Sequence, residues 1–229
     1  VSKLYLNRDL LISNEHPKFD GAPAFGIAIP RAELDNILFS RALEKGADAR
    51  ENFLITGFEK RGDAVIVEGT NNKVTTRVTT RLLVGADGAN SKVAELTGLK
   101  NEDPRYRLAS IRAYVHGLNT NHTLMFFDER YFPGYGWVFP IRDGLCNIGV
   151  GMLREPLLRD GIKLIEFYEQ FKLLVNRLAI ARGEKIEIKP HQCSPISTFG
   201  GARKNYFDGG LLIGEAGCFV DPVNGQGIA

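Results

Sequence analysis

The chain has 229 residues, 44% of them hydrophobic and 24% charged, which suits a folded α/β protein, and no apolar run is long enough to span a bilayer. Its formal net charge of +2 comes without a basic block, which excludes nucleic acid as an expected partner. The widely spaced Cys146, Cys193 and Cys218 predict reduced thiols, a cytoplasmic location and no bound metal.

Short extended segments are expected up to Ile29, followed by a helix over residues 31–45 that Pro30 opens and Gly46 ends. Further strands are predicted at 53–58, 64–69, 73–79 and 81–84, the first two of them forming a hairpin. After Asp103-Pro104 the pattern predicts a mixed sheet with strands at 107–117, 123–127, 136–140 and 146–151. One long helix at 157–181 and a last strand at 211–213 complete the prediction.

The most informative segment is 211–228, with the sequence LLIGEAGCFVDPVNGQGI. A short apolar strand ends at Gly214, where open α/β sheets place their ligands, and the carboxylate of Glu215 follows directly. The later glycines leave backbone N–H groups free to approach a flat or anionic ligand. This pattern favours a cofactor site, whereas a glycine-rich loop without a ligand is the simpler alternative.

A second strand-turn-helix pattern occupies residues 81–93, RLLVGADGANSKV. The strand ends at Gly85, Asp87 stands at its tip, and Asn90 or Ser91 can cap the helix behind it. Two strands with acidic tips suggest a single ligand site.

An aromatic strand is predicted between these two motifs, at residues 135–140, YGWVFP. Because side chains alternate along a strand, Tyr135, Trp137 and Phe139 should share one face, and Pro140 should end the ladder. Such a face suits a flat or hydrocarbon ligand, although an aromatic core strand is the alternative.

The first two motifs resemble the downstream fingerprints of flavoprotein hydroxylases and their reductase relatives, with Glu215 where that family usually has Asp and Gln226 where it commonly has Glu. The third, with Gly149-Val150-Gly151 after it, resembles the Tyr-x-Trp-x-Phe-Pro…Gly-x-Gly signature of geranylgeranyl reductases. The resemblance implies FAD as cofactor, with hydride chemistry carried by the flavin and no catalytic side chain. It assigns substrate contacts to Tyr135, Trp137, Phe139 and Pro140.

Cofactor contacts also follow from the resemblance, which assigns them to Arg31, Ile55, Asp87, Gly88, Gly214, Glu215, Asp221, Gly225, Gly227 and Ile228. Arg31 stands at a helix start, where the helix dipole opposes a cation, so a nearby anion is expected there. An ion pair of Arg31 with Glu33 or Asp35 is the alternative. Ile55 would contribute through its backbone.

The implied fold is α/β with mixed sheets: part of a Rossmann-like FAD-binding domain with an inserted substrate domain. We assign residues 1–29 and 104–198 to the substrate domain, and residues 30–103 and 199–229 to the FAD-binding domain. No Gly-x-Gly-x-x-Gly run precedes Gly85, so the sequence is interpreted as an internal piece that lacks the amino-terminal cofactor unit.

The predicted activity of the whole protein is FAD-dependent reduction of C=C bonds in a prenyl chain. An aromatic hydroxylase or halogenase that uses oxygen is the alternative enzyme, and a prenyl-lipid binding module without turnover is the alternative outside enzymes. The expected partner is a small prenyl-lipid substrate, with peripheral membrane contact as a further option. The electron donor, NAD(P)H or another reductant, and the oligomeric state do not follow from the sequence.

Overall fold

The computed structural model describes residues 1–15, 20–21, 26–71, 73–200, 204–222 and 225–228. The chain divides into two compact units, each built from two stretches of sequence. The first unit comprises Val1–Ala42 and Ala109–Ser194, and the second comprises Leu43–Leu108 and Pro195–Ala229. The predicted assignment of substrate and FAD-binding domains stays a prediction.

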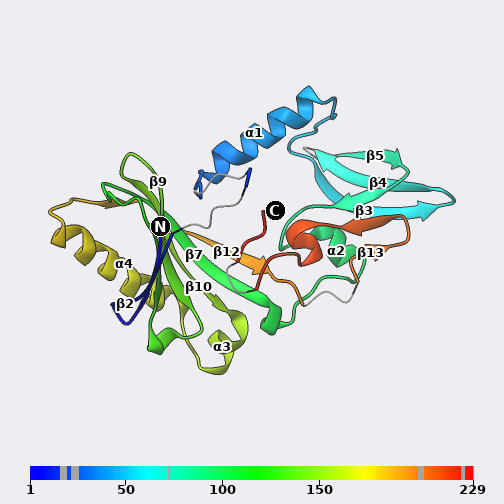
Figure 1. Cartoon of the computed structure of the whole chain (residues 1–229). Coiled ribbons are helices and arrows are strands. Elements are labelled where there is room, and N and C mark those ends of the chain that lie inside the picture. Colours follow the sequence, from blue (N-terminus) through cyan, green and yellow to red (C-terminus); the bar gives the residue numbers. More distant parts are fainter. Residues whose placement is uncertain (16–19, 22–25, 72, 201–203, 223–224, 229) are drawn as a thin grey trace. The chain divides into compact units, whose positions relative to one another are not determined.

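An eight-stranded mixed sheet dominates the first unit (Figure 1). Its strand order is β11-β7-β10-β9-β8-β1-β2, and β12 also pairs with β7. The strands are β1 (Ser2–Leu6), β2 (Asp9–Asn14), β7 (Arg107–His116), β8 (Thr123–Phe127), β9 (Tyr135–Arg142), β10 (Leu145–Leu153), β11 (Glu187–Ile188) and β12 (Gln192–Ser197). The prediction of a mixed sheet is confirmed, since β1 runs parallel to β8 whereas β8, β9 and β10 are antiparallel.

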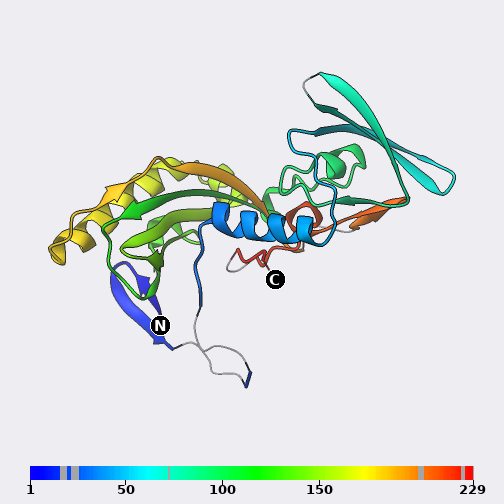
Figure 2. The same ribbon diagram turned by 90° about the horizontal axis from the view of Figure 1, so that it is seen from above.

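Helix α4 (Leu164–Ala181) covers one face of this sheet, as Figures 1 and 2 show. Ile148 and Val150 of β10 join Phe171 and Val175 of α4 in a buried apolar cluster. Gly136 lies under α4, because a Cβ atom there would stand 2.5 Å from the Phe171 ring. The face that carries Gly136 therefore belongs to the core, and the opposite face of β9 is left for other contacts.

The prediction of a single helix at 157–181 is wrong. The structure has two helices there, α3 (Arg154–Arg159) and α4, and the break falls at Gly161, whose φ is +65°. Glycine adopts this left-handed conformation without a steric penalty and so ends helices efficiently.

Pro140 does not end its strand, contrary to the prediction. Strand β9 continues to Arg142, and Pro140 is paired with Cys146 of β10. The register shifts between Leu145 and Cys146, and such an irregularity tolerates the missing N–H group of proline. By alternation Pro140 belongs to the face of Gly136, not to that of Trp137.

Helix α1 (Arg31–Glu44) forms where predicted but buries none of its residues. The expected apolar stripe stays open, with Ile37 59% and Leu38 57% exposed. Near its start Glu33 accepts a 2.9 Å hydrogen bond from Arg142 of β9, and this contact lowers the pKa of Glu33.

Two small sheets build the second unit. One is the antiparallel sheet of β3 (Leu54–Arg61), β4 (Ala64–Asn71) and β5 (Val74–Thr80), in which the predicted hairpin turns at Gly62. The other has the order β13-β14-β6, formed by β13 (Tyr206–Phe207), β14 (Gly210–Leu212) and β6 (Leu83–Gly85). Helix α2 (Lys92–Leu96) follows β6. None of the helices in the described part of the chain is both long and apolar enough to cross a membrane.

Candidate functional site

The two acidic motifs leave the same edge of one sheet. Strands β6 and β14 are parallel, with Gly85 paired to Leu212, and Ile213 N donates to Gly85 O over 2.9 Å. Because carboxyl ends of parallel strands meet at one edge, Asp87 and Glu215 follow neighbouring strand ends. The structure thus brings together the two motifs that the sequence separates widely.

The Asp87 carboxylate binds the start of helix α2. It accepts hydrogen bonds from Ser91 Oγ at 2.5 Å, Lys92 N at 2.7 Å and Val93 N at 3.2 Å. Ser91 caps the same helix, as predicted, by accepting from Ala94 N over 2.9 Å. These contacts satisfy N–H groups that a helix start leaves unpaired, so Asp87 has a structural role in addition to any ligand contact.

Glu215 lies in a short 3₁₀ turn, η3 (Gly214–Gly217), directly after β14. Gly214 starts the turn with φ +56°, and the half-buried Glu215 follows it. Cys218 ends the turn at φ +60° and is 4% exposed. Burial raises the pKa of the Cys218 thiol, so it is a small buried residue rather than a nucleophile.

A glycine-rich loop continues from this turn. Asp221 N donates to Gln226 O at 2.9 Å, and Gly225 N donates to Asp221 O at 3.0 Å. A Cβ atom on Gly227 would lie 2.7 Å from Val220 Cγ2, so this position accepts only glycine without a shift. The N–H groups of Gly227 and Ile228 bond to no other backbone group of the described residues.

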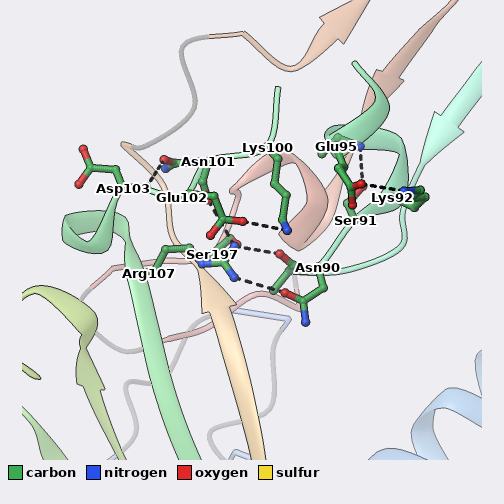
Figure 3. A network of polar contacts seen from close by, with 12 residues as sticks. Asn90, Ser91, Lys92, Glu95, Lys100, Asn101, Glu102, Asp103, Arg107 and Ser197 are labelled. Carbon is green, nitrogen blue, oxygen red and sulfur yellow. Dashed lines mark hydrogen bonds and ion pairs between the residues drawn. The ribbon is translucent and has the colours of Figure 1, made fainter. Parts of the chain in front are cut away.

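Arg107 connects the Asp-Gly loop to two other segments, a role that the sequence did not reveal. Its side chain is buried, and it donates to Ala89 O at 2.9 Å and to Ser197 Oγ at 3.1 Å. Further donation goes to Asn101 O at 3.3 Å and Asn90 Oδ1 at 3.4 Å, as Figure 3 shows for Asn90. Figure 3 also shows that the guanidinium joins residues from separate parts of the sequence. The one available signal was an arginine at the head of a strand, directly before the apolar pair Leu108 and Ala109.

The remaining predicted cofactor residues lie as follows. Arg31 makes a two-point ion pair with Asp35, with N–O distances of 3.1 and 3.2 Å. The alternative given for Arg31 is therefore present in the structure. Ile55 lies in β3, half-buried and opposite Gly69. Gly88 has φ +77° and open space at its Cβ position, so its backbone conformation requires glycine.

The three aromatic rings of β9 form a row on one face, as predicted. The ring centres of Tyr135 and Trp137 are 6.0 Å apart, as are those of Trp137 and Phe139. Phe127 of β8 extends the row, 5.7 Å from Tyr135. We call Tyr135, Trp137, Phe139 and Phe127 the aromatic row.

Trp137 lies across the two glycines of the Gly-Val-Gly segment in β10. A Cβ atom on Gly149 would stand 2.8 Å from indole Cε2, and one on Gly151 would stand 3.5 Å from indole Cζ3. Indole Nε1 also donates to Asn147 Oδ1 over 2.7 Å. The glycines therefore make room for the indole and Asn147 fixes its orientation, a function of Asn147 that the sequence did not indicate.

A protein-family model described as an FAD binding domain matches residues 12–228. Digeranylgeranylglycerophospholipid reductase of Methanocaldococcus jannaschii is 32% identical over 215 residues, which cover 90% of this chain and 52% of that protein. The chain thus spans about half the length of the curated relatives it matches.

Two solved structures show the same fold. A geranylgeranyl bacteriochlorophyll reductase-like protein from Thermoplasma acidophilum superposes with a TM-score of 0.81 at 19% identity, covering 99% of this chain and 56% of its own. A flavin-dependent halogenase, CmlS, superposes with a TM-score of 0.68 at 20% identity, covering 86% of this chain and 36% of its own. The family match, the parallel acidic motifs and the glycine-rich loop agree: this chain belongs to the FAD-binding domain family.

Proposed function

We propose that the whole protein is an FAD-dependent oxidoreductase that reduces C=C bonds in the prenyl chain of a lipid. The observation that carries the proposal is the aromatic row, with the Trp137 indole in the space that Gly149 and Gly151 leave open. A continuous ring surface suits a hydrocarbon chain, which offers no hydrogen bonds. The name of the Methanocaldococcus jannaschii relative, a reductase of a digeranylgeranyl lipid, supports this choice of substrate.

The residues of the glycine-rich loop fit an FAD. Gly227 accepts no side chain, and its N–H group and that of Ile228 can donate to an electron-rich ring edge. Glu215, at the end of β14, can accept from a ribose or ribityl hydroxyl. We assign Gly214, Gly225 and Asp221 to the backbone frame of this loop. A bound flavin supplies hydride transfer.

Arg31, Ile55, Asp87 and Gly88 have secondary roles in the proposal. Arg31 can bind a phosphate only by exchanging or sharing its ion pair with Asp35. The Asp87 carboxylate already accepts hydrogen bonds at the start of helix α2. We therefore assign the cofactor contact of this motif to the loop backbone around Gly88. Ile55 would contribute its backbone, as a strand residue of β3.

The chain's own contribution to the reaction is binding and positioning. The aromatic row holds the prenyl chain and excludes water from the reacting double bond. Of the four substrate residues predicted, Pro140 belongs to the opposite face by alternation, so we assign it no substrate contact. A substrate of this kind resides in membranes, so the proposal includes peripheral membrane contact of a cytoplasmic protein.

The test supplies chemically reduced flavin, without oxygen, to the full-length protein together with a C20 prenyl alcohol or phosphate. Mass spectrometry should detect products heavier by added hydrogen pairs. Trp137→Ala should raise KM far more than it changes flavin content, because about 3 kcal/mol of aromatic contact is lost. Tyr206→Ala, which removes an exposed ring of the second unit, is the matched control.

Two results would contradict the proposal. Oxygen-dependent hydroxylation or halogenation of a phenol, without any saturated prenyl product, would place the protein with the oxygen-using flavoenzymes. A full-length protein that stays colourless and binds prenyl lipid without flavin would be a lipid-binding module.

Glu215 gives a separate test of the cofactor assignment. In the full-length protein Glu215→Ala should weaken FAD by about one to two orders of magnitude, since a charge-assisted hydrogen bond contributes roughly 1.5–3 kcal/mol. Glu215→Asp should bind nearly as well as the parent. Glu59→Ala, an exposed change in β3, controls for loss of charge. Equal flavin occupancy in Glu215→Ala and parent would refute the contact.

A further inference from the structure

A cavity of about 410 Å³ lies in the first unit, where the β1–β2 turn and the segment after β8 meet helix α4. Its lining includes three buried rings, Phe126, Phe167 and Phe171. Phe126 and Phe171 belong to the cluster under α4, on the face opposite the aromatic row. The volume suits a small organic ligand, and the lining is mixed, with these rings beside polar and charged side chains.

Three arginines line the same cavity: Arg8, Arg130 and Arg177. Arg130 is held by Asp128, with N–O distances of 2.9 and 2.6 Å. Arg8 and Arg177 form no ion pair among the described residues, and the other carboxylate in the lining is that of Glu129. Three arginines against two carboxylates give the lining a net charge of +1, which favours binding of an anion.

Arg8 occupies a backbone conformation that ordinarily requires glycine. It lies with Asn7 in the two-residue β1–β2 turn, where φ is +51° for Asn7 and +104° for Arg8. Such turns favour Asn-Gly, because only glycine adopts the second conformation freely. The turn is fastened to the cavity wall: Asn7 N donates to Phe127 O at 3.0 Å, and Asn7 Oδ1 accepts from Glu129 N at 3.2 Å. A strained arginine fixed at a cavity points to a function for its side chain.

We propose that this cavity binds an amphipathic phosphate. The phosphate group would be held by Arg8 and Arg177, and a short hydrocarbon body would contact Phe126, Phe167 and Phe171. A free phosphate monoester and the headgroup end of a phospholipid share this chemistry. The site is distinct from the proposed flavin and prenyl sites, since its three buried rings belong to the cluster under α4, on the sheet face opposite Tyr135, Trp137 and Phe139. Phe127 is the one member of the aromatic row that lines this cavity.

Calorimetric titration of the chain tests the site with hexyl phosphate, inorganic phosphate and 1-hexanol. Hexyl phosphate should bind at least about tenfold more tightly than inorganic phosphate, and hexanol should not saturate, because affinity needs both charge and apolar contact. Short-chain dihexanoyl phosphatidic acid distinguishes a phospholipid headgroup from a free phosphate monoester as the ligand. Tighter binding than hexyl phosphate supports a lipid headgroup, and weaker binding supports a small ester.

Arg8→Gly separates a loss of binding from a loss of folding, because it should weaken ligand binding while it raises the stability of the fold. Loss of one charge-assisted contact should weaken hexyl phosphate by about tenfold or more. Relief of backbone strain should raise the melting temperature by roughly 2–4 °C. Arg177→Gln should weaken binding similarly, whereas Arg61→Gln, an exposed change in β3, should leave it unchanged.

Three outcomes would overturn the proposal. One is the absence of saturable hexyl phosphate binding. Another is equal affinity for inorganic and hexyl phosphate, since the rings would then contribute nothing. The third is unchanged affinity in both Arg8→Gly and Arg177→Gln, which would place the phosphate elsewhere.

Discussion

The indole nitrogen of Trp137 donates to the side-chain oxygen of Asn147 over 2.7 Å, although Asn147 is paired in register with Phe139 rather than with Trp137. The hydrogen bond therefore runs diagonally across β9 and β10. It ties the indole of β9 to a side chain of β10. A residue without chemical reactivity thus sets the shape of the proposed substrate surface.

Asn147→Ala should loosen the indole. We expect a loss of about 1 kcal/mol in the free energy of unfolding, because the indole N–H loses its acceptor. Trp137 is the chain's one tryptophan, so acrylamide quenching of its fluorescence reports on this ring alone, and quenching should increase. Asn36→Ala on the exposed face of α1 should leave quenching unchanged. Identical quenching in both variants would show that Asn147 does not fix the ring.

The two glycines under the indole should respond differently to alanine. At Gly149 a Cβ atom would approach Ile111 O to 2.6 Å as well as the indole, so Gly149→Ala should cost roughly 1–3 kcal/mol of unfolding free energy. At Gly151 the nearest atom would be 3.5 Å away, so Gly151→Ala should change stability far less. Denaturant unfolding of the two variants makes the comparison. Equal stabilities would contradict the described position of the indole.

Asp87→Ala should destabilise the second unit. The carboxylate accepts three hydrogen bonds at the start of α2, and loss of a helix cap costs about 1–2 kcal/mol. Asp87→Asn keeps one acceptor oxygen and should cost less. The control is Glu95→Ala, which removes an exposed ion pair with Lys92 and should change stability by less than about 1 kcal/mol. If Asp87→Ala behaved like this control in urea unfolding, its carboxylate would not be capping the helix.

Asp128 should make stability depend on pH at the acid end. Hydrogen bonds from Arg130 hold the pKa of Asp128 below its usual 3.8. Burial of the carboxylate opposes this shift, and the positive charge of Arg8 adds to it. A lowered folded-state pKa gives stabilisation that is present above the unfolded-state value and is lost as pH falls through the folded one. Asp128→Asn should therefore lose less unfolding free energy between about pH 5 and pH 2 than the parent does. Denaturant midpoints across this range measure the difference, with Asp63→Asn in the exposed β3–β4 turn expected to parallel the parent.

Local chemistry accounts for the parts of the fold that the sequence predicted. The short run of large apolar residues in Thr123–Phe127 matches β8, and the Gly62 turn matches the β3–β4 hairpin. Ser91 caps α2 because its hydroxyl stands directly before the first turn. Each of these patterns depends on neighbours within a few residues.

The errors come from contacts that local patterns do not contain. The helical spacing of apolar residues over 157–181 hid the break at Gly161, and Pro140 lies next to a register shift between β9 and β10 that the local pattern does not contain. Strand β12 was not predicted, because it is a polar strand with an internal proline that is defined by its pairing with β7. In the candidate site, the roles of Asn147 and Arg107 depend on partners that only the folded sheet supplies.

The parallel pairing of β6 with β14 imposes an order in time on the growing chain. Leu83 leaves the ribosome long before Gly210, its partner, is made. At roughly 5–20 residues per second the delay is on the order of 10 s, and during this time β6 lacks the strand that pairs with it. Meanwhile the sequence of the first unit's larger stretch, Ala109–Ser194, is translated in full. The strand that leads to Asp87 therefore gains this partner only after the intervening residues have been made, and the sheet edge that carries both acidic motifs forms late relative to the first unit's larger stretch.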